Sequence, residues 1–172
     1  DGVVGGGAGL DVDAAQLEHA RPAALDGEAH LAAGPGRLHP EVEHLGGDAD
    51  GGLTGHAEAV RIEYDPAKVS YEKLLHVFWR NIDPLAVNRQ FCDGGSQYRT
   101  GIFYLNEEQK EQAAASRDEL DKSGRFERPI VTEIVAATSF YPAEGYHQGY
   151  YKESPTRYTF YRNNSGRDQF IK

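Results

Sequence analysis

A carboxylate in this sequence stands where an apolar side chain is expected. Glu58 shares the parity of Val60 and Ile62, so its side chain should point to the same side of a strand as that apolar row. A carboxylate on that side is costly unless it is protonated or hydrogen-bonded, and burial raises its pKa. Glu58 is therefore a candidate general acid. The alternative is that the strand begins one residue later and that Glu58 is solvated.

The stretch QFCDGGSQYR, residues 90–99, supplies candidate partners for this acid. Asp93 precedes two glycines, which allow a tight or left-handed backbone. Tyr98 carries a hydroxyl that can donate to a developing oxyanion. Glu58, Asp93 and Tyr98 could then surround one polar oxygen of a small substrate. The alternative is a surface turn with a core tyrosine.

The same stretch holds the only cysteine of the chain, Cys92. A single cysteine excludes an intramolecular disulfide and a zinc site built from several cysteines. A neighbouring carboxylate disfavours the thiolate, and a misplacement of even 1 Å costs a nucleophile about 100-fold in rate. We therefore predict that Cys92 lies near the site without acting as its nucleophile.

The elements that must position these residues are those of an ordinary α/β domain. Alternating apolar and polar residues predict strands, Ser70 suits a helix N-cap, and Asn106 with Gln109 resembles a capping box. We expect, in chain order, a strand over 59–64, a helix after Ser70, a strand over 101–105, a helix from Asn106 to near Gly124, a strand over 130–135, a short helix from Pro142 through Tyr151, and a last strand over 158–161.

Composition divides the chain into two unlike parts. Of the net charge of −9, residues 1–53 carry −8, and this segment contains no aromatic residue. Such a segment buries too little apolar surface to offset its ordering entropy, which predicts a flexible tail. The acidic charge argues against nucleic acid as a partner. No apolar run approaches the ~20 residues of a membrane span and no secretory signal is found, so we expect a cytoplasmic protein.

Two patterns in residues 1–53 are weak signals of ligand binding, and neither of them predicts a bound cofactor. The glycines of residues 5–9 follow too short an apolar run for a dinucleotide-binding strand. Four histidines are spaced neither as a helical i, i+4 pair nor as a short chelating turn, so we expect no metal site. They are His19, His30, His39 and His44.

Five stretches are similar to A-type peptide methionine sulfoxide reductases. The similarity runs from Thr54 to the C-terminus, about 119 residues, and the combination of GHAEAV with DxGxQYR is highly specific. The stretches are TGHAEAVRIEYDPAKVSYEKLLHVFWRNIDP, QFCDGGSQYRTGIFYLNEEQ, RPIVTEIV, FYPAEGYHQGYY and RYTFYRNNSGRDQF.

This resemblance implies a fold, a reaction and three residue roles. The fold is α/β (α+β), a two-layer sandwich with a central mixed sheet. A cysteine thiolate attacks the sulfur of methionine-S-sulfoxide, free or in proteins, giving methionine and a sulfenic acid that thioredoxin, or dithiothreitol in vitro, reduces. No metal or organic cofactor is implied. By motif, Glu58 resembles the proton donor to the sulfoxide oxygen, Tyr98 a hydroxyl donor to it, and Asp93 the acid that organises the site.

The resemblance does not extend to the family's nucleophile. Its GCFW motif and the tyrosine of its NPTY stretch would fall within residues 1–53, which contain neither cysteine nor tyrosine. We interpret this segment as a flexible tail or, alternatively, as a stretch read in the wrong frame or strand of a GC-rich gene. Three functions follow: an active reductase that repairs oxidised proteins, a relative that binds oxidised methionine without turnover, and a scaffold whose acidic segment recruits a partner.

Overall fold

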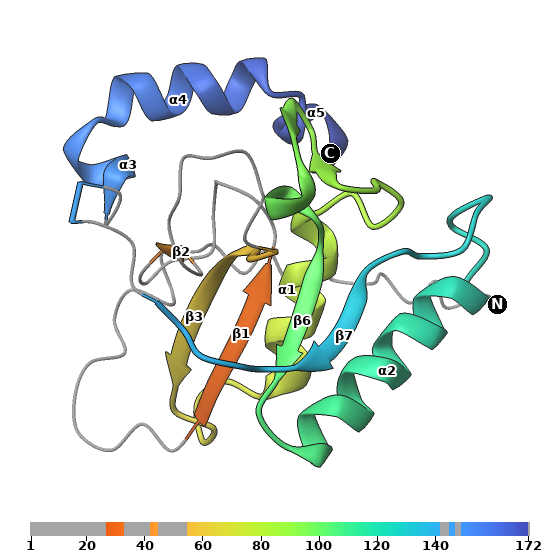
Figure 1. Cartoon of the computed structure of the whole chain (residues 1–172). Helices are drawn as coiled ribbons and strands as arrows, with labels where there is room; N and C mark the ends of the chain where they lie inside the picture. Colours follow the sequence, from red (N-terminus) through yellow and green to blue (C-terminus); the bar gives the residue numbers. More distant parts are fainter. Residues whose placement is uncertain (1–26, 33–41, 45–54, 142–144, 147–148, 172) are drawn as a thin grey trace, which may run out of the picture.

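A five-stranded sheet with helices against it forms the framework of this computed structural model, which describes residues 27–32, 42–44, 55–141, 145–146 and 149–171 (Figure 1). The strand order is β2-β3-β1-β6-β7, antiparallel except for the parallel pair β6 and β7. This mixed sheet confirms the expected fold class. The strands are β1 (Gly27–Ala32), β2 (Val42–His44), β3 (Glu58–Tyr64), β6 (Gly101–Tyr104) and β7 (Glu133–Ala136), and a separate hairpin pairs β4 (Arg89–Gln90) with β5 (Asp93–Gly94).

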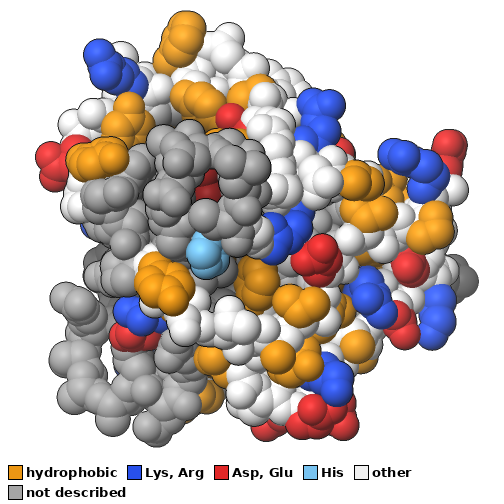
Figure 2. All heavy atoms as spheres, viewed as in Figure 1, with side chains coloured by type: hydrophobic (Ala, Val, Ile, Leu, Met, Phe, Trp, Pro, Cys, Tyr) orange, Lys and Arg blue, Asp and Glu red, His pale blue; other side chains and the backbone are white. Residues whose placement is uncertain are grey.

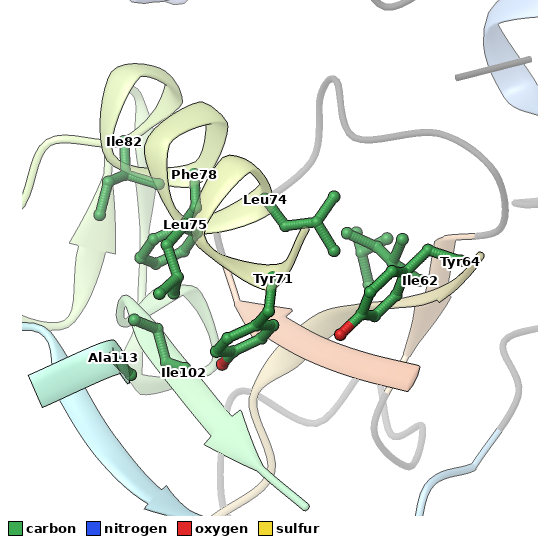
Figure 3. Close-up of a cluster of buried hydrophobic side chains, with 10 residues drawn as sticks. Ile62, Tyr64, Tyr71, Leu74, Leu75, Phe78, Ile82, Ile102 and Ala113 are labelled. Atoms are coloured by element: carbon green, nitrogen blue, oxygen red, sulfur yellow. The ribbon is translucent and has the colours of Figure 1, made fainter. Parts of the chain in front are cut away.

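The main core lies between the sheet and helix α1 (Tyr71–Asn81), as the apolar spacing of both elements predicts (Figure 3). The Ser70 side chain accepts a hydrogen bond from the Lys73 backbone N–H at 3.2 Å, which confirms the predicted N-cap. Figure 3 shows side chains of β3 and α1 pointing toward one another. The buried cluster consists of Val60, Ile62, Tyr64, Tyr71, Leu74, Leu75, Phe78, Ile82, Ile102 and Ala113.

Helix α2 (Glu107–Lys122) begins at the predicted cap and packs beside α1. The Asn106 side chain accepts from the Gln109 N–H at 2.9 Å, and the Gln109 side chain accepts in return from the Leu105 N–H at 2.9 Å. A hydrogen bond from Trp79 Nε1 to Ser116 Oγ at 3.0 Å joins the two helices. Because both helices are fixed to the sheet, they hold in place the strand ends that carry the candidate site residues.

The C-terminal part is helical where the sequence predicts a strand. The expectation of a strand over 158–161 is wrong, because these residues lie in helix α4 (Pro155–Asn164). Pro155 at the first helical position is a start signal that the alternating aromatic residues obscure. Tyr158, Tyr161 and Arg162 face inward at helical spacing whereas Phe160 is exposed. Short helices flank it, α3 (Tyr150–Glu153) and α5 (Arg167–Ile171).

Two other expectations shift along the chain. The strand predicted over 130–135 is β7, which begins at Glu133, where it pairs in parallel with β6. The helix predicted from Pro142 through Tyr151 begins only at Tyr150, since residues 145, 146 and 149 form turns; Pro142 itself lies outside the described residues. Within the described ranges, no helix has both the length and the apolar character needed to cross a membrane.

Two short pieces of the segment 1–53 take part in the sheet. β1 lies between β3 and β6 and is antiparallel to both, and β2 pairs with the start of β3 (Figure 1). The rest of the segment lies outside the described residues. The interpretations of this segment as a tail or as a misread stretch therefore stay predictions.

Candidate active site

Glu58 is the first residue of β3, and its carboxylate is hydrogen-bonded to the hydroxyl of Tyr98. This excludes the alternative that the strand begins one residue later. Partial burial raises the pKa of Glu58 to about 7, the nearby negative charge of Asp93 adds to this, and the hydrogen bond from Tyr98 opposes it. At neutral pH the carboxyl group is thus poised between its protonated and ionised forms, as general acid catalysis requires.

Asp93 reaches the site from the hairpin formed by β4 and β5. The two-residue turn between these strands is Phe91-Cys92, and Phe91 takes a positive φ of 51°. The Arg89 side chain donates to the carbonyl of Phe91 at 2.6 Å and closes this turn. The fully buried Gln90 side chain bonds both the N–H and the carbonyl of Asp83, so the hairpin is fixed to the chain that follows α1. The carboxylate of Asp93 is therefore held on a rigid support.

A sharp backbone turn places Tyr98 opposite Glu58. Gly95 adopts φ = 139°, a conformation that L side chains rarely take, and a Cβ there would lie 2.2 Å from the Gln97 side chain. The short 3₁₀ helix η2 (Ser96–Tyr98) follows at once. Burial and the negative charges of Glu58 and Asp93 raise the pKa of the Tyr98 phenol, which keeps its proton available as a hydrogen-bond donor.

Tyr161 is a fourth member of this cluster, and the sequence gives no sign of it. From α4 its hydroxyl donates a hydrogen bond to the Asp93 carboxylate. Burial and this hydrogen bond raise the pKa of the Tyr161 phenol above its usual range. The next helix, α5, begins with the buried Arg167, which donates to the Asn81 carbonyl at 2.9 Å and lies 4.5 Å from the centre of the Phe91 ring. Tyr161 could be found only once α4 was known to fold back over the hairpin.

Cys92 lies beside this cluster, with an exposed side chain. Its Sγ is 3.6 Å from the hydroxyl of Tyr161. The sequence-based expectation that Cys92 lies near the site agrees with this geometry. Its assignment as a bystander stays a prediction, since position alone does not report reactivity.

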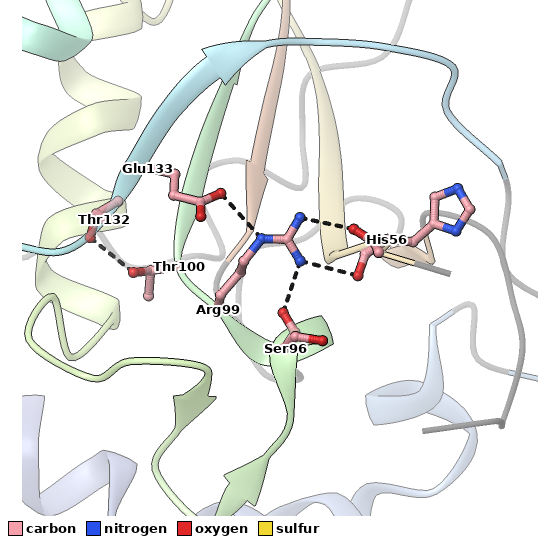
Figure 4. A network of polar contacts seen from close by, with 7 residues as sticks. His56, Ser96, Arg99, Thr100, Thr132 and Glu133 are labelled. Atoms are coloured by element: carbon pink, nitrogen blue, oxygen red, sulfur yellow. Dashed lines mark hydrogen bonds and ion pairs between the residues drawn. The ribbon is translucent and has the colours of Figure 1, made fainter. Parts of the chain in front are cut away.

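Arg99 is a second residue whose place the sequence does not reveal. Its guanidinium donates to the backbone carbonyls of Gly55, His56 and Ser96 at 3.1, 3.2 and 2.8 Å (Figure 4). Its Nε lies 3.2 Å from a carboxylate oxygen of Glu133 on β7. Arg99 thus joins the turn that carries Tyr98 to the backbone that leads into Glu58.

The structure brings Glu58, Asp93 and Tyr98 together, as the sequence predicts, and adds Tyr161. This arrangement offers one carboxyl group of raised pKa and one phenol to an oxygen atom placed between Glu58 and Tyr98. In the described part of the chain, no three His, Cys, Asp or Glu side chains are grouped so as to hold a metal ion.

Solved structures resemble this fold. The structure of methionine sulfoxide reductase A of Corynebacterium diphtheriae superposes with a TM-score of 0.59 at 26% identity, covering 74% of each chain. Mxr1 from Saccharomyces cerevisiae in its reduced form has a TM-score of 0.64 at 24% identity, covering 76% of this chain and 86% of its own, and supports the fold alone.

Sequence relatives are closer. A protein of Listeria monocytogenes serotype 4a named peptide methionine sulfoxide reductase MsrA is 54% identical over 120 residues, 70% of this chain and 68% of its own. The protein of the same name from Bacillus subtilis is 54% identical over 118 residues, 69% of this chain and 67% of its own. The sequence model of the family described as peptide methionine sulfoxide reductase matches residues 48–172. This chain belongs to the peptide methionine sulfoxide reductase family.

Proposed function

We propose that the chain acts on methionine-S-sulfoxide, free or in oxidised proteins, and that Glu58 delivers the proton that the sulfoxide oxygen takes up during reduction. The observation that carries the proposal is the hydrogen-bonded pair of Glu58 and Tyr98, in which the pKa of Glu58 is raised to about 7. A carboxylic acid with this pKa is half protonated at neutral pH and gives up its proton readily.

The chemistry requires a proton donor because the S–O bond is hard to break without one. A thiolate forms a bond to the sulfoxide sulfur, and the S–O bond breaks as the oxygen takes up two protons and leaves as water. Water then adds to the thiol sulfur, the S–S bond breaks, and methionine leaves with the electron pair of that bond. The sum of thiol and sulfoxide is sulfenic acid and methionine, which balances oxygen and electrons. In this proposal Glu58 and Tyr98 donate to the oxygen, where negative charge develops.

Asp93 has a supporting role in this proposal. Its negative charge raises the pKa of Glu58, and its carboxylate accepts the hydrogen bond of the Tyr161 hydroxyl. Asp93 therefore organises the donors rather than giving up a proton itself. This role agrees with the one that the family resemblance implies.

Thioredoxin as reductant and a cytoplasmic location complete the proposal. The sulfenic acid must be reduced by a second thiol, and thioredoxin keeps thiols reduced in the cytosol. No metal or organic cofactor takes part, since thiols supply the electrons. Neither nucleic acid nor a membrane is proposed as a partner.

Binding without turnover is the second candidate function. The observation that favours it is that the sequence contains one thiol, Cys92, which is exposed and adjoins Asp93 in the chain. A site that retains Glu58 and Tyr98 would then bind a sulfoxide through its oxygen and leave it unreduced.

One experiment separates these functions. Intact mass near 18.9 kDa with one alkylated thiol first establishes that the purified chain has this sequence. A peptide carrying methionine-S-sulfoxide is then incubated with the protein and dithiothreitol, with the R-sulfoxide peptide as the matched control. Conversion of the S epimer alone supports the reductase, and one-to-one binding of the S peptide without conversion supports the second candidate. Neither binding nor conversion of the S epimer would contradict both.

A further inference from the structure

We propose that Arg99 is a positioning residue, which clamps the turn carrying Tyr98 onto the backbone leading into β3 and so keeps Tyr98 hydrogen-bonded to Glu58. The inference rests on the proposed function, in which Glu58 is the proton donor. Arg99 would set the position of this proton donor without touching the reacting atoms.

The contacts of Arg99 connect three segments that are far apart in sequence. Its guanidinium donates to Ser96 within η2 and to Gly55 and His56 just before β3, and it pairs with Glu133 on β7. Tyr98 is the residue next to Arg99, and Glu58 is two residues beyond His56. The Arg99 side chain therefore contacts both the turn that carries Tyr98 and the backbone that leads to Glu58, and it fixes the distance between these two residues.

The backbone before Glu58 needs such an anchor. The β2–β3 ladder begins with the pair His44–Glu58, and the β1–β3 ladder ends at Val60. Among the described residues, no strand partner thus holds Gly55 and His56. Gly55 also takes φ = 75°, a left-handed turn that leaves its carbonyl free of the sheet ladder. The hydrogen bonds from Arg99 to the carbonyls of Gly55 and His56 take the place of hydrogen bonds to a neighbouring strand.

Arginine is suited to this position and lysine is not. The planar guanidinium directs several N–H donors in fixed directions, so that it can serve three carbonyls and a carboxylate at once. A lysine ammonium carries the same charge but offers three donors from one nitrogen. Replacing Arg99 by lysine therefore keeps the charge and loses the clamp.

The groups that face Glu58 define what a change at Arg99 should do. Tyr98 comes from η2 and Asp93 from β5, while Tyr161 and Arg167 act on the site through Asp93. If Arg99 acts by position, its loss lets Glu58 become solvated. The pKa of Glu58 then falls toward the ordinary value, because burial raises this pKa by more than the Tyr98 hydrogen bond lowers it. If Arg99 acts only by its charge, lysine leaves the pKa of Glu58 unchanged and glutamine raises it.

The test is an NMR titration of the Glu58 side-chain carboxyl in the protein without substrate, assigned with Glu58→Gln. Arg99→Lys and Arg99→Gln are compared with the native chain. Glu133→Gln is the matched control, because it removes the charge of the ion pair with Arg99 and leaves the hydrogen bonds to the three carbonyls. We expect both Arg99 variants to titrate well below pH 7 and Glu133→Gln to titrate close to the native chain. Added guanidinium ion should restore the native titration in Arg99→Ala.

Other results would overturn the proposal. A native titration midpoint in Arg99→Lys would assign Arg99 a role through charge alone. If all the Arg99 variants are unfolded by circular dichroism and guanidinium does not refold Arg99→Ala, Arg99 is a residue of general stability. Because the titration needs neither substrate nor thiol, its failure is distinguishable from a failure of the peptide assay that tests the proposed function.

Discussion

Two regions of the molecule build the site in different ways. The region of residues 55–104 rests on the sheet and on the buried cluster under α1, and its polar side chains are tied to backbone groups. The region of α3–α5 stands away from that core (Figure 1). Several of its aromatic side chains are exposed, Phe160 at 72%. Figure 2 shows hydrophobic side chains at the surface of this part of the molecule. It is joined to the first region through Arg167, Tyr161 and their partners.

The difference shows which half of the site is fixed by folding of the core. Glu58, Asp93 and Tyr98 keep their places as long as the sheet and its attached turns are intact. Tyr161 keeps its place only while α4 and α5 stay docked on the hairpin. The ion pair of Arg162 and Asp168 at 2.6 Å joins the two helices to each other, and the contact of Arg167 with Phe91 joins α5 to the hairpin. The predictions below test this contrast.

The largest effect is expected from Glu58→Gln, which removes the transferable proton and keeps the size of the side chain. If the chain turns over, the rate of S-sulfoxide reduction should fall by about 10²- to 10⁴-fold, the usual contribution of a general acid. Glu63→Gln is the matched control, because Glu63 lies on the same strand and is exposed. An equal loss in both variants would contradict the assignment.

The two regions should differ in their contribution to stability. Phe78→Ala empties a fully buried position under the sheet and should lower the free energy of unfolding by about 3–5 kcal/mol. Phe160→Ala removes an exposed ring on α4 and should change it by less than about 0.5 kcal/mol. Urea unfolding measures both. Similar losses would show that α4 belongs to the core.

The raised pKa of Glu58 should make stability depend on pH. The folded chain holds this proton up to about pH 7 whereas the unfolded chain releases it near pH 4.5, so stability is lost as pH rises through this window. Relative to the native chain, Glu58→Gln should gain nothing at pH 4 and at most about 3 kcal/mol at pH 8, at about 1.4 kcal/mol per pKa unit. A gain that does not change with pH would mean that Glu58 is fully solvated.

A smaller effect is expected from Tyr161→Phe, which leaves the ring and removes the hydroxyl that donates to Asp93. Loss of one hydrogen bond to a charged group costs about 1.5–3 kcal/mol, so the free energy of unfolding should fall by about this amount. Tyr150→Phe, on the exposed side of α3, is the control and should unfold as the native chain does. Native stability of Tyr161→Phe in urea unfolding would show that this hydrogen bond does not hold α4 in place.

Local patterns predict the first region well and the second poorly. β3, α1 and α2 were predictable because apolar spacing, Ser70 and Asn106 act within a few residues, and the parity of Glu58 with Val60 follows from the strand itself. β1 was not predictable, because its place depends on pairing with β3 and β6 rather than on its own residues.

The sequence did not reveal Arg99 and Tyr161 for a similar reason, since their places also depend on contacts with segments far away in the chain. Two partners of Arg99, the backbone carbonyls of Gly55 and His56, lie about forty residues away in the chain, and carbonyls leave no signature in a sequence. The sequence did not identify Tyr161 as a site residue, because the spacing of Tyr158, Phe160 and Tyr161 is as typical of a strand as of a helix. Glu58, Asp93 and Tyr98 were found because each bears a chemical group in a specific motif.

The measurement that tests the central claim most directly is the pH dependence of the affinity for a methionine-S-sulfoxide peptide, in the native chain and in Glu58→Gln. Protonated Glu58 donates to the sulfoxide oxygen, so the native affinity should weaken as pH rises through about 7, by up to tenfold per pH unit, and the affinity of Glu58→Gln should not change there. The same pH dependence in both proteins would contradict the assignment of Glu58 as the proton donor.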